Sequence, residues 1–338
     1  MSRFKQAKPK DPHVILAEVV RTERVTPNMV RVTFGGESLR LFEPLGHDQW
    51  FRLFLPRAGQ QALRLPTRSS ALWYAQFLRM PKDQRPYVRN YTVRAFRPAG
   101  AAAAAAAAGD STAGASSAGA ALAHPELDVD FVLHGSGSGP ASDWAASAAP
   151  GDTAGILDQG IAYTPAHDPD WHLIAVDETG LPAAAGILAS LPRDARGHAF
   201  VELPTAADAQ HLDAPAGVEV HWLPRAAPGS TAQTPHAPHT AGTGHTPGTA
   251  HTPGTAHALD AAHLPDAAHT PDAAHQVPGR LALEAASALT LPEGRGYAYL
   301  AGESALATGL RRHLVAQGMP KSDISFVGYW RIGHAAAG

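Results

Sequence analysis

The chain has 338 residues, enough for two ordinary domains, and its 44% apolar content is normal for a globular protein. A formal charge of −3 argues against a general nucleic-acid binder, because such proteins are basic overall. The absence of cysteine excludes disulfides, thiolate metal sites, iron–sulfur clusters and cysteine nucleophiles.

The N-terminus, MSRFKQAKPK, is basic, but no apolar run follows it, so we expect no signal peptide. No window approaches the ~18 consecutive apolar residues of a membrane span, so we expect no membrane insertion. These observations predict a cytoplasmic protein. The sequence does not reveal the oligomeric state, and we take a monomer as the expectation.

The first block, residues 13–160, alternates apolar and polar residues in short runs separated by turn residues. A short helix is expected within residues 68–86, and a glycine turn, a helix and a last strand are expected after residue 133. This pattern predicts a small antiparallel β-barrel. The predicted strands cover residues 14–25, 29–34, 49–56, 90–96 and 127–133.

A low-complexity segment interrupts each block. Residues 99–123 are almost entirely Ala, Gly and Ser, and nothing in them can bury an apolar face. Residues 229–277 are rich in His, Thr, Pro, Ala and Gly, and six histidines recur every six residues from His245 to His275. A period of six fits neither a helix face nor a strand, so we expect a disordered surface loop.

The second block, residues 170–334, alternates strands with helices, which predicts a parallel α/β sheet. A β-barrel followed by an α/β domain is the domain order of the ferredoxin-reductase group of flavoenzymes. The predicted strands cover residues 172–178, 198–204, 218–224, 296–303 and 323–333, and the predicted helices 179–192, 280–292 and 304–320.

The segment RNYTVR concentrates hydrogen-bonding side chains on a predicted strand. Guanidinium groups bind phosphate oxygens bidentately, and a tyrosine ring can stack on an aromatic heterocycle. A ligand with phosphates and a flat ring would use both, whereas a surface strand with solvated arginines is an equally open alternative. Strand alternation places Arg89, Tyr91 and Val93 on one face and Asn90, Thr92 and Arg94 on the other.

A glycine-rich turn opens the next predicted helix, between Gly135 and Pro140. Such a turn presents free N–H groups to an anion, and the helix dipole adds to the attraction. The turn is neither a dinucleotide fingerprint nor a P-loop, since Pro140 stands where the final glycine would fall and no lysine follows. Taken alone it is equally compatible with a flexible loop.

Three segments of the second block lie at predicted strand ends, where α/β sheets open their ligand crevices. Asp177, Glu178 and Thr179 can cap the helix that follows them, and capping alone would explain them. Glu303 precedes a helix with basic residues that could equally be solvated, and Tyr329 could be ordinary core.

Together these segments resemble the siderophore-interacting proteins, a family of ferric-siderophore reductases. RNYTVR resembles the family's flavin motif Arg-x-Tyr-Thr-x-Arg, and the glycine turn resembles its His-Gly, Gly-Pro-Ala, Trp and Pro-Gly-Asp series. DETGLP, AGE and YWRIG resemble three segments of its nicotinamide domain. One departure is that GILDQG, after Asp152, lacks the positive charge of the family's Gly-Pro-x-Gly segment.

The resemblance implies an N-terminal Greek-key barrel that binds FAD and an α/β domain that binds NADPH or NADH. Arg52 and Arg331 are the candidates for docking a ferric siderophore. Neither a catalytic acid–base pair nor a protein metal site is expected, because the flavin is the redox centre. The implied cofactor-binding residues are Arg89, Tyr91, Thr92, Val93, Arg94, His134, Gly135, Gly139, Pro140, Ala141, Trp144, Asp177, Glu178, Thr179, Gly302, Glu303, Tyr329 and Trp330.

The implied activity is FAD-dependent reduction of siderophore-bound Fe(III) by NAD(P)H, which releases Fe(II). Two alternatives stay open: a flavin-dependent reductase of another acceptor, and a non-enzymatic protein that binds a siderophore or metal. The histidine repeat offers imidazole ligands, but a flexible Pro/Gly-rich chain holds no coordination geometry and loses entropy on ordering. The identity of the siderophore is not encoded in any segment we can interpret.

Overall fold

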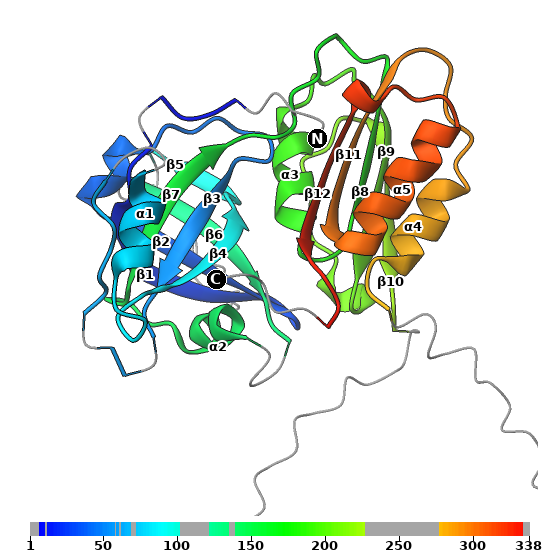
Figure 1. The fold of residues 1–338 in the computed structure, drawn as a ribbon. Helices are drawn as coiled ribbons and strands as arrows, with labels where there is room; N and C mark the ends of the chain where they lie inside the picture. Colours follow the sequence, from blue (N-terminus) through cyan, green and yellow to red (C-terminus); the bar gives the residue numbers. More distant parts are fainter. Residues whose placement is uncertain are drawn as a thin grey trace, which may run out of the picture.

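The computed structural model describes residues 7–10, 12–57, 59–60, 62–68, 72–101, 122–134, 139–226 and 277–333. Two sheets lie side by side, the first at the N-terminal end of the chain and the second at the C-terminal end (Figure 1). Most of both low-complexity segments, and Gly135, lie outside the described residues, so the predictions made for them stay predictions.

The first sheet has seven antiparallel strands in the order β4-β3-β7-β1-β2-β6-β5. Alternate side chains of these strands fill one core, as the period-two pattern predicts. The sheet curls until β4 lies beside β6, which closes the predicted barrel. Its elements are β1 (Ile15–Thr26), β2 (Met29–Gly35), η1 (Glu37–Leu41), β3 (Trp50–Leu55), α1 (Leu72–Arg79), β4 (Tyr87–Thr92), β5 (Ala95–Arg97), β6 (Glu126–Val132), α2 (Pro140–Ser147) and β7 (Thr153–Gly160).

The single strand predicted over residues 90–96 is divided in the structure into β4 and β5. Strand β4 pairs with β3, whereas β5 pairs with β6. Between them the Val93 N–H donates to the Gln49 carbonyl, and the Arg94 N–H donates to the Asp128 carbonyl. The chain therefore changes partners at this point, and this exchange joins the two ends of the sheet.

The second sheet has five parallel strands in the order β10-β9-β8-β11-β12, as the alternation of strands and helices predicts. Strand order reverses between β8 and β11, the position where open α/β sheets bind ligands. Its elements are β8 (Trp171–Val176), α3 (Leu181–Ser190), β9 (Arg196–Leu203), η2 (Ala206–Asp208), β10 (Gly217–Pro224), α4 (Arg280–Ser287), β11 (Gly296–Glu303), α5 (Ser304–Ala316), η4 (Lys321–Asp323) and β12 (Ile324–Trp330).

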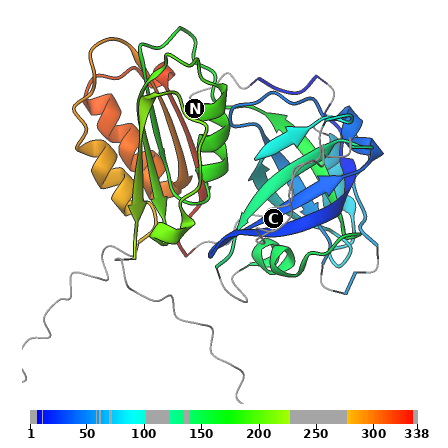
Figure 2. The ribbon, with the colours of Figure 1, turned by 180° about the vertical axis from the view of Figure 1, so that it is seen from behind.

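Helix α3 covers the face of this sheet toward the barrel, and α4 and α5 cover the opposite face, as Figures 1 and 2 show. The core under α3 includes barrel residues such as Met29, so apolar packing is continuous between the two units. Polar contacts add to it: the Asp208 carboxylate accepts hydrogen bonds from Thr26 Oγ1 (2.8 Å) and from the N–H of Asn28 (2.9 Å). The two sheets thus share one packed boundary.

None of the helices among the described residues is both long and apolar enough to span a bilayer.

Candidate functional site

Strand β4 and helix α2 bring the first two predicted motifs together. The half-buried ring of Tyr91 packs on Phe131 of β6, with 4.3 Å between the ring centroids. Phe131 in turn contacts Trp144 of α2 at 5.8 Å, and Trp144 stacks on Phe34 of β2 at 6.1 Å. This aromatic cluster fixes α2 against the strand that carries the paired arginines.

The start of α2 presents backbone N–H groups beside Gly139. Gly139 precedes the helix with φ 155°, and Pro140 occupies the first turn, where its missing N–H is not needed. A Cβ built on Gly139 would have no neighbour within 4 Å, so there is free space in front of the helix. The N–H of His134, at the end of β6, donates to Ser142 Oγ (3.4 Å) and ties the preceding strand to this helix.

Arg89 lies on the same face of β4 as Tyr91 and is half-buried. Its Nη1 makes a local hydrogen bond to the Val88 carbonyl (2.8 Å), and no acidic partner is found for it among the described residues. A half-buried guanidinium without an acidic partner is suited to bind an anion.

Arg94, in contrast, is already engaged by the barrel itself. Its Nε lies 3.5 Å from Asp130 Oδ2, and Arg31 makes a bidentate bond to the same carboxylate. Burial lowers the pKa of Arg94, and the Asp130 charge opposes that effect. The structure therefore separates the two arginines of the motif: one has an acidic partner and the other has none.

Thr92 faces the second sheet. Its side chain is buried and lies near the Tyr329 hydroxyl of β12. That hydroxyl lies 2.9 Å from the hydroxyl of Tyr299 on β11, which lies near Asp48 of the barrel. Burial raises the pKa of Tyr329 to about 12, and burial likewise raises the pKa of Asp48.

Asp177, directly after β8, gathers the three C-terminal motifs. Its Oδ1 accepts hydrogen bonds from the Thr179 N–H (2.9 Å) and hydroxyl (2.5 Å). Its Oδ2 accepts from the Glu303 N–H (2.6 Å) and from Trp330 Nε1 (3.0 Å). Burial, reinforced by the charge of Glu178, raises the pKa of Asp177 to about 7. One carboxylate thus fixes the ends of β8, β11 and β12 at the point where strand order reverses.

Gly302 makes this close packing possible. Its φ of 130° disfavours other residues, and a Cβ at this position would lie 2.5 Å from Asp177 Cγ. Glu303 then caps α5 by accepting a hydrogen bond from the Ala305 N–H. Local packing and helix capping therefore account for the glycine and the glutamate of the Ala-Gly-Glu segment, whether or not the segment also contacts a nucleotide.

Glu178 belongs to a buried charge cluster that was not predicted. It makes a bidentate ion pair with Arg225 (2.7 and 2.8 Å), and Arg225 also bonds Glu202 (3.0 Å). Burial lowers the pKa of Arg225, but the bonds to Glu178 and then Glu202 outweigh it and hold that pKa above its usual value. Glu178 follows β8, Glu202 lies near the end of β9 and Arg225 directly follows β10. The cluster depends on the pairing of these three strands, which sequence order alone could not reveal.

The two candidate docking arginines occupy different surroundings. Arg52 on β3 is half-buried, with its guanidinium 5.2 Å from the Trp73 ring centre and Nε 3.4 Å from Gln159 Oε1. Its cross-strand partner Asn90 is two residues from Thr92, on the same face of the sheet. Arg331 is exposed directly after β12. No contact between the two arginines is found among the described residues.

The remaining predicted residues have structural neighbours of their own. Val93 packs against the barrel core, and Ala141 belongs to it. Functional candidates that the sequence did not indicate are Asp48 and Tyr299, which link the two sheets through side chains more than 200 positions apart. They come together only because the two sheets pack against each other.

Two family models match consecutive parts of the chain. The siderophore-interacting FAD-binding domain matches residues 18–111 and 114–163, and the siderophore-interacting protein model matches residues 169–333. The first covers the barrel and α2, and the second covers the parallel sheet and its helices.

Curated relatives match over part of their length. An uncharacterized protein from Mycobacterium bovis is 37% identical over 209 residues, which are 62% of this chain and 64% of that protein. The ferric vibriobactin reductase ViuB of Vibrio cholerae is 29% identical over 62% of this chain and 66% of its own. The NADPH-dependent ferric-chelate reductase of Escherichia coli is 27% identical over 61% and 69%. The match with the first of these relatives thus spans less than two thirds of its length.

A solved structure extends the likeness to nearly the whole chain. A siderophore utilization protein from T. fusca is 29% identical with a TM-score of 0.64, and the match covers 98% of this chain and 97% of that one. This shared architecture and the two consecutive family matches place the chain in the siderophore-interacting protein family.

Proposed function

We propose that this chain is an FAD-dependent reductase that uses NAD(P)H to reduce Fe(III) held in a siderophore. The observation that carries the proposal is the packing of β4, which bears Arg89 and Tyr91, against α2 through Phe131 and Trp144, in a barrel that shares an apolar core with the C-terminal sheet. Thr92, on the same strand, lies near Tyr329 of that sheet.

The residues of the barrel fit FAD. The guanidinium of Arg89 and the N–H groups at the start of α2 are the donors for the pyrophosphate, since both lack an acidic partner among the described residues. The half-buried ring of Tyr91 offers a surface for the isoalloxazine, and Phe131 supports it from behind. Arg94 then acts by tying β5 to β6, through Asp130, next to the flavin strand.

The nicotinamide nucleotide belongs at the C-terminal edge of the parallel sheet, between β8 and β11. Asp177 holds this edge rigid through four hydrogen bonds, and Trp330 is oriented by one of them. Arg225 is taken up by two carboxylates, so it is a poor candidate for a phosphate ligand. The name of the Escherichia coli relative favours NADPH over NADH.

Bound FAD would accept two electrons together as a hydride and pass them on singly, which suits one-electron reduction of iron. The protein contributes position: the shared apolar core and the bonds of Asp208 to Thr26 and Asn28 fix the two sheets relative to each other. Arg52 and Arg331 supply positive charge that would attract an anionic ferric siderophore.

Purified protein tests the proposal directly. We expect it to take up FAD, to bleach anaerobically when NADPH is added, and to recolour with a ferric siderophore while an Fe(II) chelator traps the product. Recolouring by other acceptors but not by ferric siderophores would indicate a reductase of another kind. A protein that cannot take up FAD would leave only siderophore or metal binding.

The placement of the flavin is tested by a double substitution, Arg89→Ala with Tyr91→Ala. We expect loss of flavin with the fold retained, as checked by circular dichroism. The matched control removes another Arg–Tyr pair at the opposite end of β4, Arg57 over the ring of Tyr87 at 4.5 Å. Flavin occupancy that falls equally in both variants would contradict the placement.

A further inference from the structure

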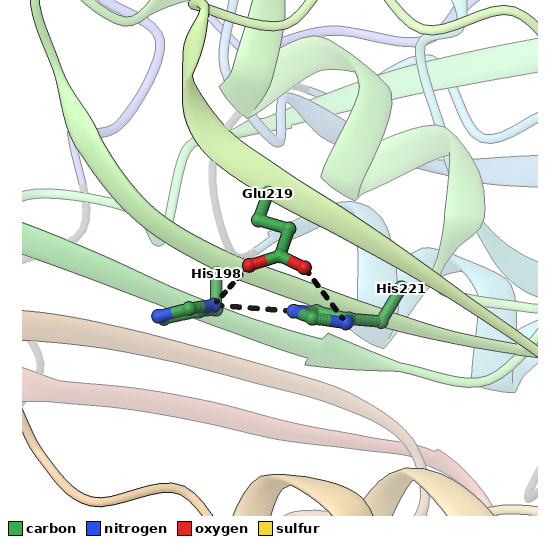
Figure 3. Close-up of side chains that lie close together, drawn as sticks. All are labelled: His198, Glu219 and His221. Carbon is green, nitrogen blue, oxygen red and sulfur yellow. Dashed lines mark hydrogen bonds and ion pairs between the residues drawn. The ribbon is translucent and has the colours of Figure 1, made fainter.

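Two histidines and a glutamate meet on the outer strands of the parallel sheet, apart from the proposed flavin site. His198 lies on β9, and Glu219 and His221 lie two residues apart on the neighbouring edge strand β10. Glu219 is the cross-strand partner of His198, so all three side chains lie on the same face of the sheet, as Figure 3 shows. Each offers one ligand atom, and these atoms lie within 4.8 Å of one another.

One hydrogen bond and two longer contacts connect the three side chains. His198 Nδ1 lies at hydrogen-bond distance, 3.1 Å, from His221 Nε2, and the carboxylate of Glu219 is 3.6 Å from His198 Nδ1 and 3.8 Å from His221 Nδ1. The two carboxylate distances are those of ion pairs and exceed those of a hydrogen bond. The carboxylate therefore faces both rings without a hydrogen bond to either.

The rings are held in place by stacking. His221 lies on Phe200 with 4.5 Å between ring centroids and 10° between planes, and His198 stacks on the same ring at 6.2 Å. The histidine side chains are 24% and 28% exposed, whereas that of Glu219 is 68% exposed. Two preoriented imidazoles thus face solvent beside a carboxylate that is free to turn toward them.

We propose that His198, Glu219 and His221 form a binding site for a divalent transition-metal cation, with Zn²⁺ as the representative ion. Nitrogens bound at 2.0–2.1 Å to a tetrahedral zinc lie about 3.3 Å apart, close to the separation of the two imidazole nitrogens. A small rotation of Glu219 would bring Oε2 to the same ion. Three protein ligands leave a position for water, and two imidazoles with one carboxylate suit zinc and its first-row neighbours.

The site joins the edge strand β10 to β9, and His221 lies four residues before Arg225. Bound metal would cross-link the two strands. The regularly spaced histidines of residues 245–275 lie outside the described residues, and they too offer imidazole ligands to added metal.

Zinc titration of the full chain against a chromophoric chelator tests the proposal. The double variant His198→Ala with His221→Ala should lose one zinc equivalent that the wild type binds. His211→Ala, which removes an exposed histidine elsewhere, is the control and should keep that equivalent. Because every variant retains the histidines of 245–275, zinc bound there cancels in the comparison.

A second variant, Glu219→Gln, tests the metal site even if the double variant does not fold. The side chain is exposed and nearly isosteric, so the fold should persist, while zinc affinity at this site should fall at least about tenfold. A zinc-soaked crystal should show anomalous density between the three side chains. Wild-type stoichiometry and affinity in Glu219→Gln, with no such density, would overturn the proposal.

Discussion

Replacing Gly302 by alanine tests whether Asp177 is the structural centre of the second sheet. Alanine must adopt the φ of 130°, and such a conformation costs a non-glycine residue about 1–3 kcal/mol. Its Cβ would also lie 2.5 Å from Asp177 Cγ, and overpacking of this kind costs about 1–3 kcal/mol more. The free energy of unfolding should therefore fall by about 2–6 kcal/mol, a large part of a typical domain's stability.

Urea unfolding of the variant and of a control measures the two contributions separately. Gly318 has a φ of 92° with no atom within 4 Å of a built Cβ, so Gly318→Ala should suffer the backbone cost alone. We expect Gly302→Ala to unfold at a clearly lower urea concentration than Gly318→Ala, with an unchanged slope. Equal losses of stability in the two variants would refute the argument, because they would show that Asp177 moves away from the added Cβ without loss of stability.

Three further outcomes are expected from unfolding experiments. Arg225→Met should cost about 3–5 kcal/mol, because it leaves two buried carboxylates without a cation; an unchanged stability would contradict this. Burial holds the folded pKa of Asp177 near 7, above its unfolded value of about 4, so this residue's contribution to stability is complete below pH 4 and is lost as the pH rises through 7. Asp177→Asn cannot titrate, and its stability relative to the wild type should improve between pH 5 and pH 8; a constant difference would be inconsistent with the raised pKa. Tyr329→Phe should lose about 1 kcal/mol, because its hydroxyl bonds that of Tyr299, whereas an unchanged stability would show that this hydrogen bond contributes nothing.

Local sequence patterns predicted the fold well where an element is amphipathic over its own length. The alternation at the start of β1 and the helical spacing in α5 are properties of neighbouring residues, and tertiary packing reinforces both. The division of the predicted strand over 90–96 was missed for the same reason. Alternation continues through Val93, and nothing local shows that the pairing partner changes there.

The site was predicted only as far as its residues act locally. Asp177 was expected to cap the following helix, but no side chain caps α3, and Asp177 bonds Thr179 before the helix begins. Its bonds to Glu303 and Trp330 cross 126 and 153 positions. The ion pair of Arg94 with Asp130 likewise depends on barrel closure. Such contacts follow from strand order and register, which a single sequence does not specify.

The anchoring role of Glu202 bears on how the long repeat between β10 and α4 is tolerated. This carboxylate bonds Arg225 just before the repeat and accepts hydrogen bonds from the N–H groups of Gly279 and Ala282 just after it. The two ends are thereby fixed to one side chain, whatever the length of chain between them. Since loop-closure entropy grows only by about 0.6 kcal/mol for each doubling of length, repeat units can be gained or lost here at little thermodynamic cost.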